Sequence, residues 1–337
     1  MILLDSLYIN NSGGKILLDY LVKECEKNHL DVFYLFDNRC EDSFKEIPSN
    51  KKLYLKATLL NRLLFYTKNK NKFSSVLCFG NIPPLIKMNA KVFTYFHQLL
   101  FLGLPDGLKL KQRLKLKLKI KILTLLKQNT DYWIVQSELI KEKLNTKFNL
   151  FSSNTLCIPF FEPTSNKMQS VEPPLINSYI YVSNATPHKN HKRLIQAFCE
   201  FYDEHKTGVL TLTIPFNNIE INEILSNRRE EGYPIKNLGF VERSEIIKAF
   251  YQHQYLIFPS LAESFGLGLV EAIECNCKVI SADLPYVYEV CKPSLVFDPY
   301  NIISIKRALD TSLKKNLPNS EKRIWNKIDD LLILLND

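Results

Sequence analysis

The sequence predicts an α/β protein with two doubly wound domains, and three observations support that fold class. Short apolar runs alternate with longer segments that suit helices, which is the rhythm of parallel sheets covered by helices. A chain of 337 residues is long for one domain and comfortable for two. Prolines and polar residues interrupt both periodicities at 161–177, so we expect a linker between the domains there.

The first predicted domain, residues 1–165, begins with a strand at Ile2–Leu4 and a turn at Asn10–Gly14 that opens a helix. Its other expected strands are Asp31–Phe36, Lys52–Lys56, Val76–Gly80, Val92–Phe96 and Asp131–Val135. Such short apolar runs are typical of buried parallel strands. We predict a helix at 109–127, KLKQRLKLKLKIKILTLLK, because this segment is long and free of Gly and Pro, although Lys and Leu alternate at 115–122 as in a strand.

The second predicted domain, residues 176–318, opens with a strand at Tyr179–Ser183 that leads into the loop NATPHKNHK at 184–192. Its further expected elements are strands at Val209–Ile214, Ile235–Val241, Leu256–Phe258, Lys278–Ser281 and Leu295–Phe297, and helices at Arg193–Glu204, Ile219–Arg229, Ser244–Tyr251 and Ile302–Leu313. An amphipathic pattern around Trp325 predicts a last helix within residues 319–337.

Composition excludes several classes of protein. Hydrophobic residues make up 46% and charged residues 23% of the chain, as in globular proteins. No run of 18 uncharged apolar residues exists, so we expect no membrane-spanning helix, and the start MILLDSLYINNSGG suits a first strand better than a signal peptide. The eight cysteines are scattered without a Cys-x-x-Cys motif, which favours reduced thiols over a zinc site.

The positive charge lies in the first half of the chain. Residues 1–176 hold 26 Lys+Arg and 15 Asp+Glu, or +11, whereas residues 177–337 hold 18 and 20, or −2. The segment 109–127 alone carries eight cations and no acid. It fits an element that lies on an anionic membrane surface, with a merely solvated basic helix as the alternative. Nucleic acid is not expected as a partner, because interleaved aromatic residues are missing.

The stretch IFPSLAESFGLGLVEAIECNCKVISADLPYVYEVC, residues 257–291, carries the strongest functional signal. A buried strand runs into a tight turn with Glu263, and a helix that starts near Leu267 carries Glu271. The N–H groups of Ser264, Phe265, Gly266 and Leu267 are the open donors of a helix start, where an anion such as a diphosphate binds. The alternative is a core strand followed by an amphipathic helix with two solvated carboxylates.

This stretch resembles the E-x7-E signature of retaining glycosyltransferases of family 4, with Glu263 and Glu271 as the two acids. The flanking matches are Phe258-Pro259-Ser260, Val279-Ile280-Ser281, Pro285 and Glu289-Val290. The resemblance implies the GT-B fold, two Rossmann-like doubly wound domains facing a central cleft, with the last helix crossing back to the first domain. Specific motifs cover most of the second half, whereas the first half matches only in its general pattern.

The resemblance also assigns roles to residues of the second half. Glu263 would hold hydroxyls of the donor sugar, Glu271 would accept hydrogen bonds from the ribose, and Phe240 lies where the nucleotide base is held. Lys189 occupies the place of a lysine that grips the donor diphosphate, a role that suits a point charge. The family often has an arginine where this chain has Asn184, which puts a second cationic contact in doubt; His188 or Arg193 are weak candidates to replace it.

Two places in the first half are candidate site residues. Gly13 and Gly14 follow the first strand, where a phosphate or sugar can approach backbone amides, although a tight turn would need glycine anyway. His97 ends a strand, and ligands of α/β sheets bind beyond the carboxyl ends of strands. In family 4 a histidine at this position often faces the donor sugar; the alternative is a packed loop histidine.

The resemblance implies transfer of a hexose-type sugar, with retention, from UDP- or GDP-sugar to a glycan acceptor. No Asp-x-Asp motif is present, so we expect no bound metal and no cofactor. The basic first half favours a lipid-linked oligosaccharide acceptor, surface polysaccharide synthesis (O antigen or capsule), and a cytoplasmic location at the inner face of the cell membrane. Two alternatives stay open: a sugar-nucleotide epimerase or hydrolase on the same scaffold, and a non-catalytic basic membrane adaptor.

Overall fold

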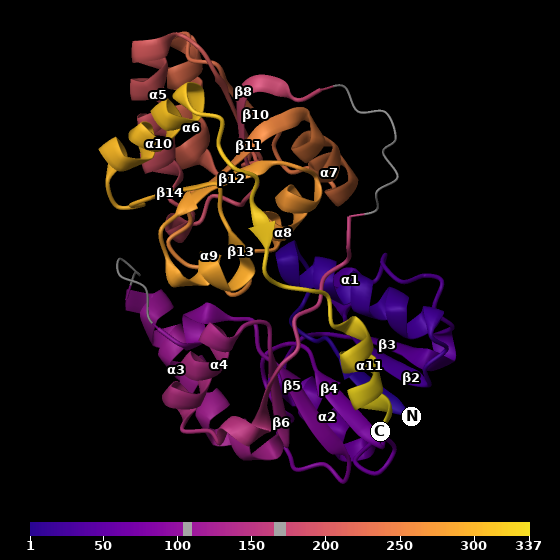
Figure 1. Ribbon diagram of the computed structural model, residues 1–337. Helices are drawn as coiled ribbons and strands as arrows, with labels where there is room; N and C mark the ends of the chain where they lie inside the picture. Colours follow the sequence, from indigo (N-terminus) through magenta and orange to yellow (C-terminus); the bar gives the residue numbers. More distant parts are fainter. Residues whose placement is uncertain (104–109, 165–172) are drawn as a thin grey trace. The chain divides into compact units, whose positions relative to one another are not determined.

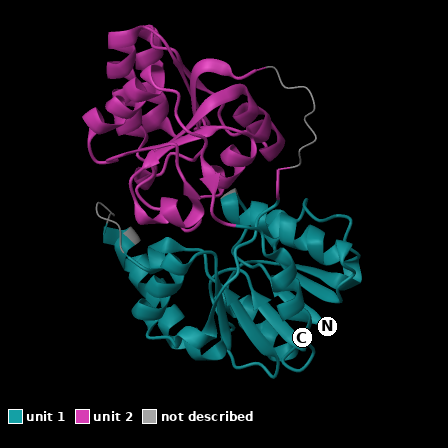
Figure 2. Ribbon diagram, in the orientation of Figure 1, with its two compact units in different colours: residues 1–162, 325–337 teal, residues 163–324 magenta. Residues whose placement is uncertain are grey.

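A computed structural model describes residues 1–103, 110–164 and 173–337, and the chain forms two compact units. Unit 1 contains Met1–Glu162 and Trp325–Asp337, and unit 2 contains Pro163–Ile324 (Figure 2). The expected linker at 161–177 includes residues 165–172, which lie outside the described residues. The last residues of the expected linker belong to a strand, because the first strand of unit 2 starts at Leu175.

Unit 1 is built on a seven-stranded parallel sheet with the strand order β3-β2-β1-β4-β5-β6-β7 (Figure 1). The strands are β1 (Ile2–Asp5), β2 (Val32–Asp37), β3 (Lys52–Leu55), β4 (Ser75–Cys78), β5 (Lys91–Tyr95), β6 (Tyr132–Val135) and β7 (Thr155–Cys157). The helices are α1 (Ser12–Lys27), α2 (Leu59–Lys68), α3 (Leu110–Leu126), α4 (Glu138–Phe148) and α11 (Ile328–Asn336), with short 3-10 turns η1 (Asn38–Cys40), η2 (Ser49–Lys51), η3 (Leu99–Phe101), η4 (Lys127–Asn129) and η5 (Ser152–Asn154).

Unit 2 is built on a six-stranded parallel sheet with the order β10-β9-β8-β11-β12-β14. The strands are β8 (Leu175–Tyr181), β9 (Val209–Leu212), β10 (Ile235–Asn237), β11 (His253–Phe258), β12 (Lys278–Ala282) and β14 (Leu295–Phe297), with an antiparallel pair β13 (Cys291–Lys292) and β15 (Glu321–Lys322). The helices are α5 (His191–His205), α6 (Ile219–Glu230), α7 (Arg243–Gln252), α8 (Leu267–Glu274), α9 (Pro285–Val290) and α10 (Ile302–Lys314), with the 3-10 turn η6 (Pro187–Lys189).

Both sheets form because their strands are apolar on two faces and are covered by helices. In unit 1 one core cluster joins β1 and β4 to α2, with Leu3, Val76 and Tyr66 almost completely buried. A second cluster packs α3 and α4 on β6, with Leu123, Trp133 and Leu144 at its centre. These faces confirm the α/β class and the helical reading of 110–126 over the strand alternative; Lys109 lies outside the described residues.

The strand order reverses once in each sheet, between β1 and β4 in unit 1 and between β8 and β11 in unit 2. Ligands of open α/β sheets bind beyond the carboxyl ends of the strands at such a point, because the loops diverge there. The fold therefore directs attention to the loops after β1, β4 and β5 in unit 1, and to those after β8 and β11 in unit 2.

Two sequence expectations are wrong in detail. Helix α1 begins at Ser12, so Gly13 and Gly14 lie in its first turn and not in a turn before it. The last helix begins only at Ile328, because the chain before it pairs with the region after α9: the Arg323 N–H donates to the Val290 carbonyl at 2.8 Å, next to the β13–β15 pair. The helix itself, α11, packs on β4 and α1 within unit 1.

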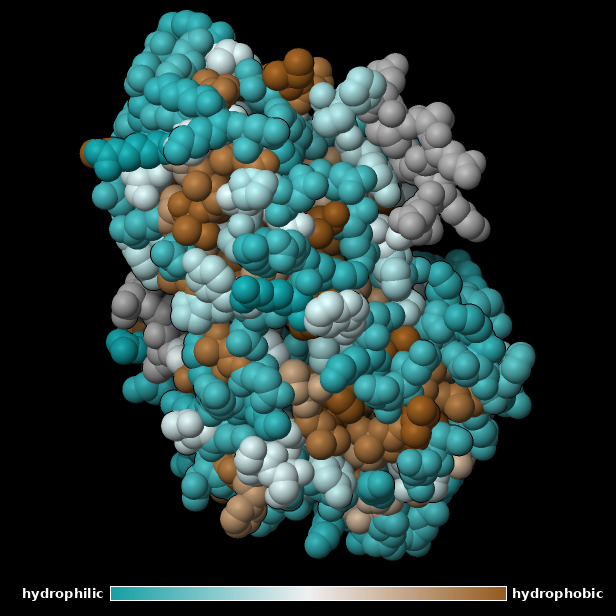
Figure 3. Space-filling view, in the orientation of Figure 1, coloured by the Kyte–Doolittle hydropathy of each residue, from teal (hydrophilic) through white to brown (hydrophobic). Residues whose placement is uncertain are grey.

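The surface gives no sign of a membrane-spanning element. In the described part of the chain, no helix combines the length and apolar character needed to cross a bilayer. Hydrophobic residues on the face seen in Figure 3 form separate groups among hydrophilic ones in both units. All eight cysteines are free thiols, and all but Cys157 are buried.

Candidate functional site

The loops that follow β8 and β11 are bonded to each other at the point where the strand order of unit 2 reverses. The Leu261 N–H donates to the His188 carbonyl at 2.7 Å. Asn190, which ends η6 in the left-handed region with φ 62°, donates from Nδ2 to the Pro259 carbonyl at 3.2 Å. These bonds fix the loop of Lys189 against the turn that carries Glu263.

Lys189 and Glu263 form an ion pair across this junction. The Lys189 Nζ lies 2.6 Å from Glu263 Oε1, and the two side chains are only 16% and 12% exposed. The Tyr181 hydroxyl at the end of β8 donates to the Lys189 carbonyl at 3.1 Å, which orients the lysine. Burial, and then the Lys189 charge, lower the pKa of His191 to about 3, so a positive potential reaches beyond the pair.

The start of α8 supplies backbone donors beside Glu263. Gly266 is its N-cap residue and has φ 84°, a left-handed conformation that a side chain would strain. The helix has no side-chain cap at this end, and the first N–H groups of any helix lack intrahelical acceptors. Phe265 is buried beneath the turn, whereas Ser264 and Leu267 are half-buried. Of the four predicted anion-binding amides, only that of Leu267 belongs to α8; Gly266 is the N-cap residue, and Ser264 and Phe265 precede it in the turn.

Glu271 sits inside unit 2 and has a cationic partner that the sequence did not reveal. Its side chain is 6% exposed, and its Oε1 accepts a hydrogen bond from Arg243 Nε at 2.9 Å. Arg243 is the first residue of α7, and 28 positions separate the two residues in the chain. The sequence could not reveal this pair, because spacing along the chain does not show which residue of one helix faces the start of another.

Phe240 is a surface residue, not part of the core. Its side chain is 75% exposed in the loop after β10, and Phe216, in the loop after β9, is 72% exposed. Gly239 connects them: it has φ 73°, and a Cβ there would lie 2.4 Å from the Phe216 ring. Two exposed aromatic side chains therefore stand at adjacent strand ends, and Phe216 was missed because an isolated Phe reads as core.

Asn184, which stands where the family often has an arginine, and the two weak candidates to replace that arginine, Arg193 and His188, have local interactions. Asn184 is exposed and its Oδ1 accepts from the Thr186 hydroxyl at 3.3 Å. Arg193 Nη1 donates to Asn190 Oδ1 at 2.9 Å, so this guanidinium supports the Lys189 loop. Burial and the neighbouring Lys189 charge lower the pKa of His188, which therefore offers no cation at neutral pH.

The candidate residues of unit 1 form a group of their own. His97 follows β5, and a Cβ added to Gly14 would lie 3.7 Å from its Nε2, whereas nothing lies within 4 Å of a Cβ at Gly13. Asn81, in the loop after β4, holds His97 through two hydrogen bonds. The structure thus brings His97 and Gly14 together and leaves Gly13 exposed.

Helix α3 buries one face and exposes leucines on the opposite one. Leu116 and Leu123 belong to the core of unit 1. The exposed leucines are spaced four residues apart in the first half of the helix: Leu110 is 73%, Leu114 58% and Leu118 59% exposed. Lysines surround this row of leucines, with 115, 117, 119 and 121 all exposed.

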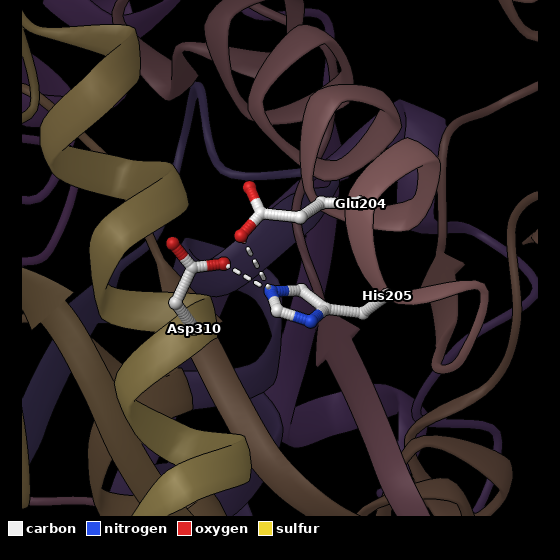
Figure 4. A group of neighbouring side chains, drawn as sticks. All are labelled: Glu204, His205 and Asp310. Atoms are coloured by element: carbon white, nitrogen blue, oxygen red, sulfur yellow. Dashed lines mark hydrogen bonds and ion pairs between the residues drawn. The ribbon is translucent and has the colours of Figure 1, made fainter.

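One group of possible metal ligands occurs among the described residues, far in sequence from the predicted site: Glu204, His205 and Asp310. In Figure 4 the Glu204 and Asp310 carboxylates both point at the His205 ring, whose Nε2 lies 2.9 Å from Asp310 Oδ1. Lys306 Nζ already forms ion pairs with both acids, at 2.5 Å from Glu204 and 3.1 Å from Asp310. The group therefore works as an ion-pair network between α5 and α10.

An open depression of about 470 Å³ also lies between α5 and α10. Its lining residues are Gln196, Glu200, Asp298, Tyr300, Asn301, Ile302 and Ile303. None of the predicted site residues takes part in it. With few buried polar groups facing it, this depression does not compete with the junction of the β8 and β11 loops as the candidate site.

Comparison with known proteins supports the sequence resemblance. Residues 167–328, just under half of the chain, match the family of glycosyl transferases group 1, which confirms the resemblance to group 1 glycosyltransferases for this part of the chain. The O-antigen chain mannosyltransferase B of Escherichia coli is 24% identical over 139 residues, which cover 40% of this chain and 36% of that protein. The GtfA subunit of the UDP-N-acetylglucosamine–peptide N-acetylglucosaminyltransferase of Streptococcus pneumoniae is 27% identical over 164 residues, covering 46% and 31%. The alignments thus span about a third of these relatives.

Solved structures extend the likeness to nearly the whole chain. Sucrose-phosphate synthase from Thermosynechococcus elongatus matches with a TM-score of 0.69 and 16% identity, covering 93% of this chain and 90% of that one. Anabaena HepE in complex with UDP and glucose has a TM-score of 0.68 and 14% identity over 93% and 90%. The lipopolysaccharide outer core galactosyltransferase WaaB has a TM-score of 0.62 and 16% identity over 94% and 91%. These likenesses confirm the GT-B fold with its two Rossmann-like domains.

Proposed function

We propose that this protein is a retaining glycosyltransferase that moves a hexose-type sugar from a nucleotide-diphosphate sugar to a glycan acceptor during synthesis of a bacterial surface polysaccharide. The observation that carries the proposal is the Lys189–Glu263 pair, which sits at the switch point of unit 2 beside the uncapped start of α8. The group 1 family match over 167–328 and the O-antigen mannosyltransferase among the relatives support the same reading.

Each part of the donor has a candidate partner in unit 2. Lys189 and the first amides of α8 are a cation and a set of dipoles that suit a diphosphate. Glu263, on the other side of the ion pair, accepts from sugar hydroxyls. Glu271 accepts from the ribose, with Arg243 orienting its carboxylate through a hydrogen bond. Phe240, together with Phe216, provides exposed aromatic surface for the base.

The proposed reaction needs no nucleophile from the protein. The bond between the anomeric carbon and the diphosphate oxygen breaks, and the acceptor hydroxyl forms its new bond on the same face. The hydroxyl proton passes to the departing phosphate oxygen, and the bonding electrons leave with the diphosphate. Lys189 and the amides of α8 stabilise the charge that develops there. We propose that these groups replace a divalent cation.

Helix α3 supports a membrane-associated acceptor, such as a lipid-linked oligosaccharide. Its exposed leucines at 110, 114 and 118 would enter the lipid headgroup region, and the surrounding lysines would meet anionic lipids. No acidic residue occurs in 109–127 to oppose this contact. We therefore place the enzyme on the cytoplasmic, inner face of the cell membrane, where sugar nucleotides are available.

A binding and turnover experiment separates this function from its two rivals. Thermal unfolding with UDP, GDP and their sugar conjugates identifies the donor, because a ligand that binds only the folded state raises Tm. The selected donor is then incubated alone and with glycan acceptors. We expect donor consumption only when an acceptor is present, with an anomeric configuration that matches the donor. Consumption without an acceptor would indicate an epimerase or hydrolase, and no stabilisation by any sugar nucleotide would favour an adaptor.

A further inference from the structure

The oxygen and the nitrogen of the Asn81 side-chain amide both hydrogen-bond to one residue, His97. The backbone N–H of His97 donates to Asn81 Oδ1 at 2.7 Å, and Asn81 Nδ2 lies 3.1 Å from His97 Nε2. Asn81 is 6% exposed and has φ 68°, a left-handed conformation that asparagine tolerates better than most residues. The left-handed backbone and the two hydrogen bonds together hold the Asn81 side chain in one orientation toward His97.

The direction of these bonds fixes the protonation of the imidazole. A backbone N–H can only donate, so the amide atom that faces it must be the oxygen Oδ1. The NH2 group, which can only donate, therefore faces Nε2. His97 Nε2 must accept, and in a neutral ring the proton then resides on Nδ1.

The Nδ1 atom of His97 has no partner in the described part of the protein. It is out of contact with solvent and makes no hydrogen bond there. The rings of Phe79 and Tyr95 flank the imidazole, with centroids at 5.6 and 5.4 Å. Burial alone lowers the pKa of His97 to about 4, and Tyr95 is the one titratable ring packed on it among the described residues. A buried donor left without an acceptor is unfavourable, so an acceptor atom that reached Nδ1 would be bound favourably.

The loop of Asn81 is itself held by a buried ion pair. Arg62 Nε donates to Asp5 Oδ2 at 2.7 Å, and both side chains are almost completely buried. The same guanidinium donates to the carbonyls of Ile82 and Pro83 at 2.8 and 2.9 Å. The chain directly after Asn81 is therefore fixed to α2 and to the end of β1.

Gly80 fixes the loop from the other side. A Cβ at this position would lie 2.3 Å from the Leu7 carbonyl oxygen, so only glycine allows the loop to pass so close to the end of β1. The position of Asn81 relative to His97 is thus set by the switch point of unit 1, and not by the two residues alone.

We propose that Asn81 is a positioning residue that holds His97 neutral with its proton on Nδ1, so that His97 acts on the substrate only as a hydrogen-bond donor. The tautomer follows from the geometry of unit 1. The second part, donation to an oxygen of the sugar substrate, rests on the proposed function. Together they exclude His97 as a general base, because Nε2 is engaged and Nδ1 carries the proton.

Nitrogen NMR of the full-length protein labelled with 15N in its six histidines tests the tautomer. The His97 signals are identified by their loss in His97→Gln. We expect a protonated Nδ1 and an unprotonated Nε2 between pH 6 and 8. A proton on Nε2 in the unsubstituted protein would overturn the proposal, whatever the activity of the protein.

Asn81→Asp is the sharpest variant, because a carboxylate still accepts from the His97 N–H but can no longer donate to Nε2. We expect the proton to move to Nε2 or a second proton to bind, and kcat for sugar transfer to fall about tenfold or more, with a new dependence on pH between 6 and 8. Asn89→Asp is the control, since Asn89 is exposed and bonds only to Asn71 among the contacts recorded for the described chain. An unchanged tautomer in Asn81→Asp would contradict the positioning role.

The substrate part has a separate readout. Addition of the donor identified by thermal unfolding should shift the Nδ1–H signal of His97, whereas the free nucleotide without a sugar should not. If the tautomer is as expected but no sugar nucleotide moves the signal, the positioning role stands and donation to the substrate is excluded. If no sugar nucleotide binds at all, the proposed function fails while the tautomer result remains.

Discussion

The Lys189 ammonium lies 2.6 Å from the Glu263 carboxylate, although 74 residues separate the two in the chain. Each residue lies in the connection that follows one of the two strands at the switch point of unit 2. The pair keeps both charges compensated while no ligand is bound, because two partly buried ions would otherwise be costly. In the function proposed above, a diphosphate binds the Lys189 ammonium in place of Glu263, and the Glu263 carboxylate is then available for sugar hydroxyls.

Removal of the cation should affect transfer more than stability. For Lys189→Ala we expect kcat/KM for the donor to fall roughly 100-fold or more, the usual cost of losing one group that stabilises developing charge. Steady-state kinetics with the identified donor measure this. The control is Lys192→Ala, an exposed lysine on α5 that pairs with Glu220. Equal activity of the two variants would remove Lys189 from the site.

Removal of the Glu263 charge should affect nucleotide binding and sugar transfer in opposite directions. In Glu263→Gln the lysine no longer has a competing carboxylate, so we expect free nucleoside diphosphate to bind a few-fold more tightly. Transfer should nevertheless slow by about 100-fold, because the sugar loses a charged acceptor. Titration calorimetry and kinetics on the same preparation test both. Glu220→Gln, the matching change in the exposed Lys192 pair, should alter neither quantity.

Loss of Arg243 should lower the stability of unit 2 and also weaken the binding of the donor ribose. Glu271 is 6% exposed, so Arg243→Ala removes a close ionic partner from a buried carboxylate. We expect a loss of about 1–3 kcal/mol in the free energy of unfolding and a raised KM for the donor. Urea unfolding and kinetics measure these effects. Arg229→Ala, on the exposed side of α6, should be neutral in both assays.

Acid should destabilise unit 2 through His191. Burial and the Lys189 charge lower the pKa of His191 to about 3 in the folded chain, below its ordinary unfolded value. The unfolded chain therefore binds the proton first, and the contribution is complete above about pH 6.5 and declines as the pH falls. The expected loss is about 2 kcal/mol between pH 7 and pH 5. In His191→Gln this part of the pH dependence should vanish, whereas it should persist in His29→Gln, a change at an exposed residue.

The exposed leucines of α3 should mediate membrane binding. We expect the double variant Leu114→Gln, Leu118→Gln to lose most of its cosedimentation with vesicles that contain anionic lipid, because both apolar contacts with the bilayer surface disappear. The matched control is Leu60→Gln, Leu64→Gln, an equally exposed pair on α2. If both double variants bind alike, or if the parent protein ignores anionic lipid at low salt, α3 is not the membrane contact.

The sequence revealed those parts of the site that are local in the chain. Glu263, Gly266 and Glu271 lie within one strand–turn–helix segment, so their spacing identified them together. Lys189 was singled out by the resemblance to family 4, in which a lysine of the loop after this strand contacts the donor diphosphate. The same reasoning did not pair Arg243 with Glu271 or Phe216 with Gly239, because no periodicity records which strand ends are neighbours.

Local patterns were also insufficient where the chain makes long-range backbone bonds. Residues 320–327 have a helical pattern, yet the Arg323 N–H is taken by Val290 and the helix starts later. Gly13 and Gly14 suggested a turn, but the backbone there is already helical. In the first case a distant partner determined the conformation, and in the second the helix simply begins earlier than the glycines suggested.

The sequence by itself determined the α/β class, the alternation of strands and helices, and the signature from Glu263 to Glu271, because apolar periodicity and helix starts are properties of neighbouring residues. Only the tertiary structure decided that Lys189 contacts Glu263, that Arg243 neutralises Glu271, and that Asn81 fixes the proton of His97. Those relationships depend on the order of strands in a sheet. Strand order is a property of the whole sheet, and it brings residues together regardless of their separation along the chain.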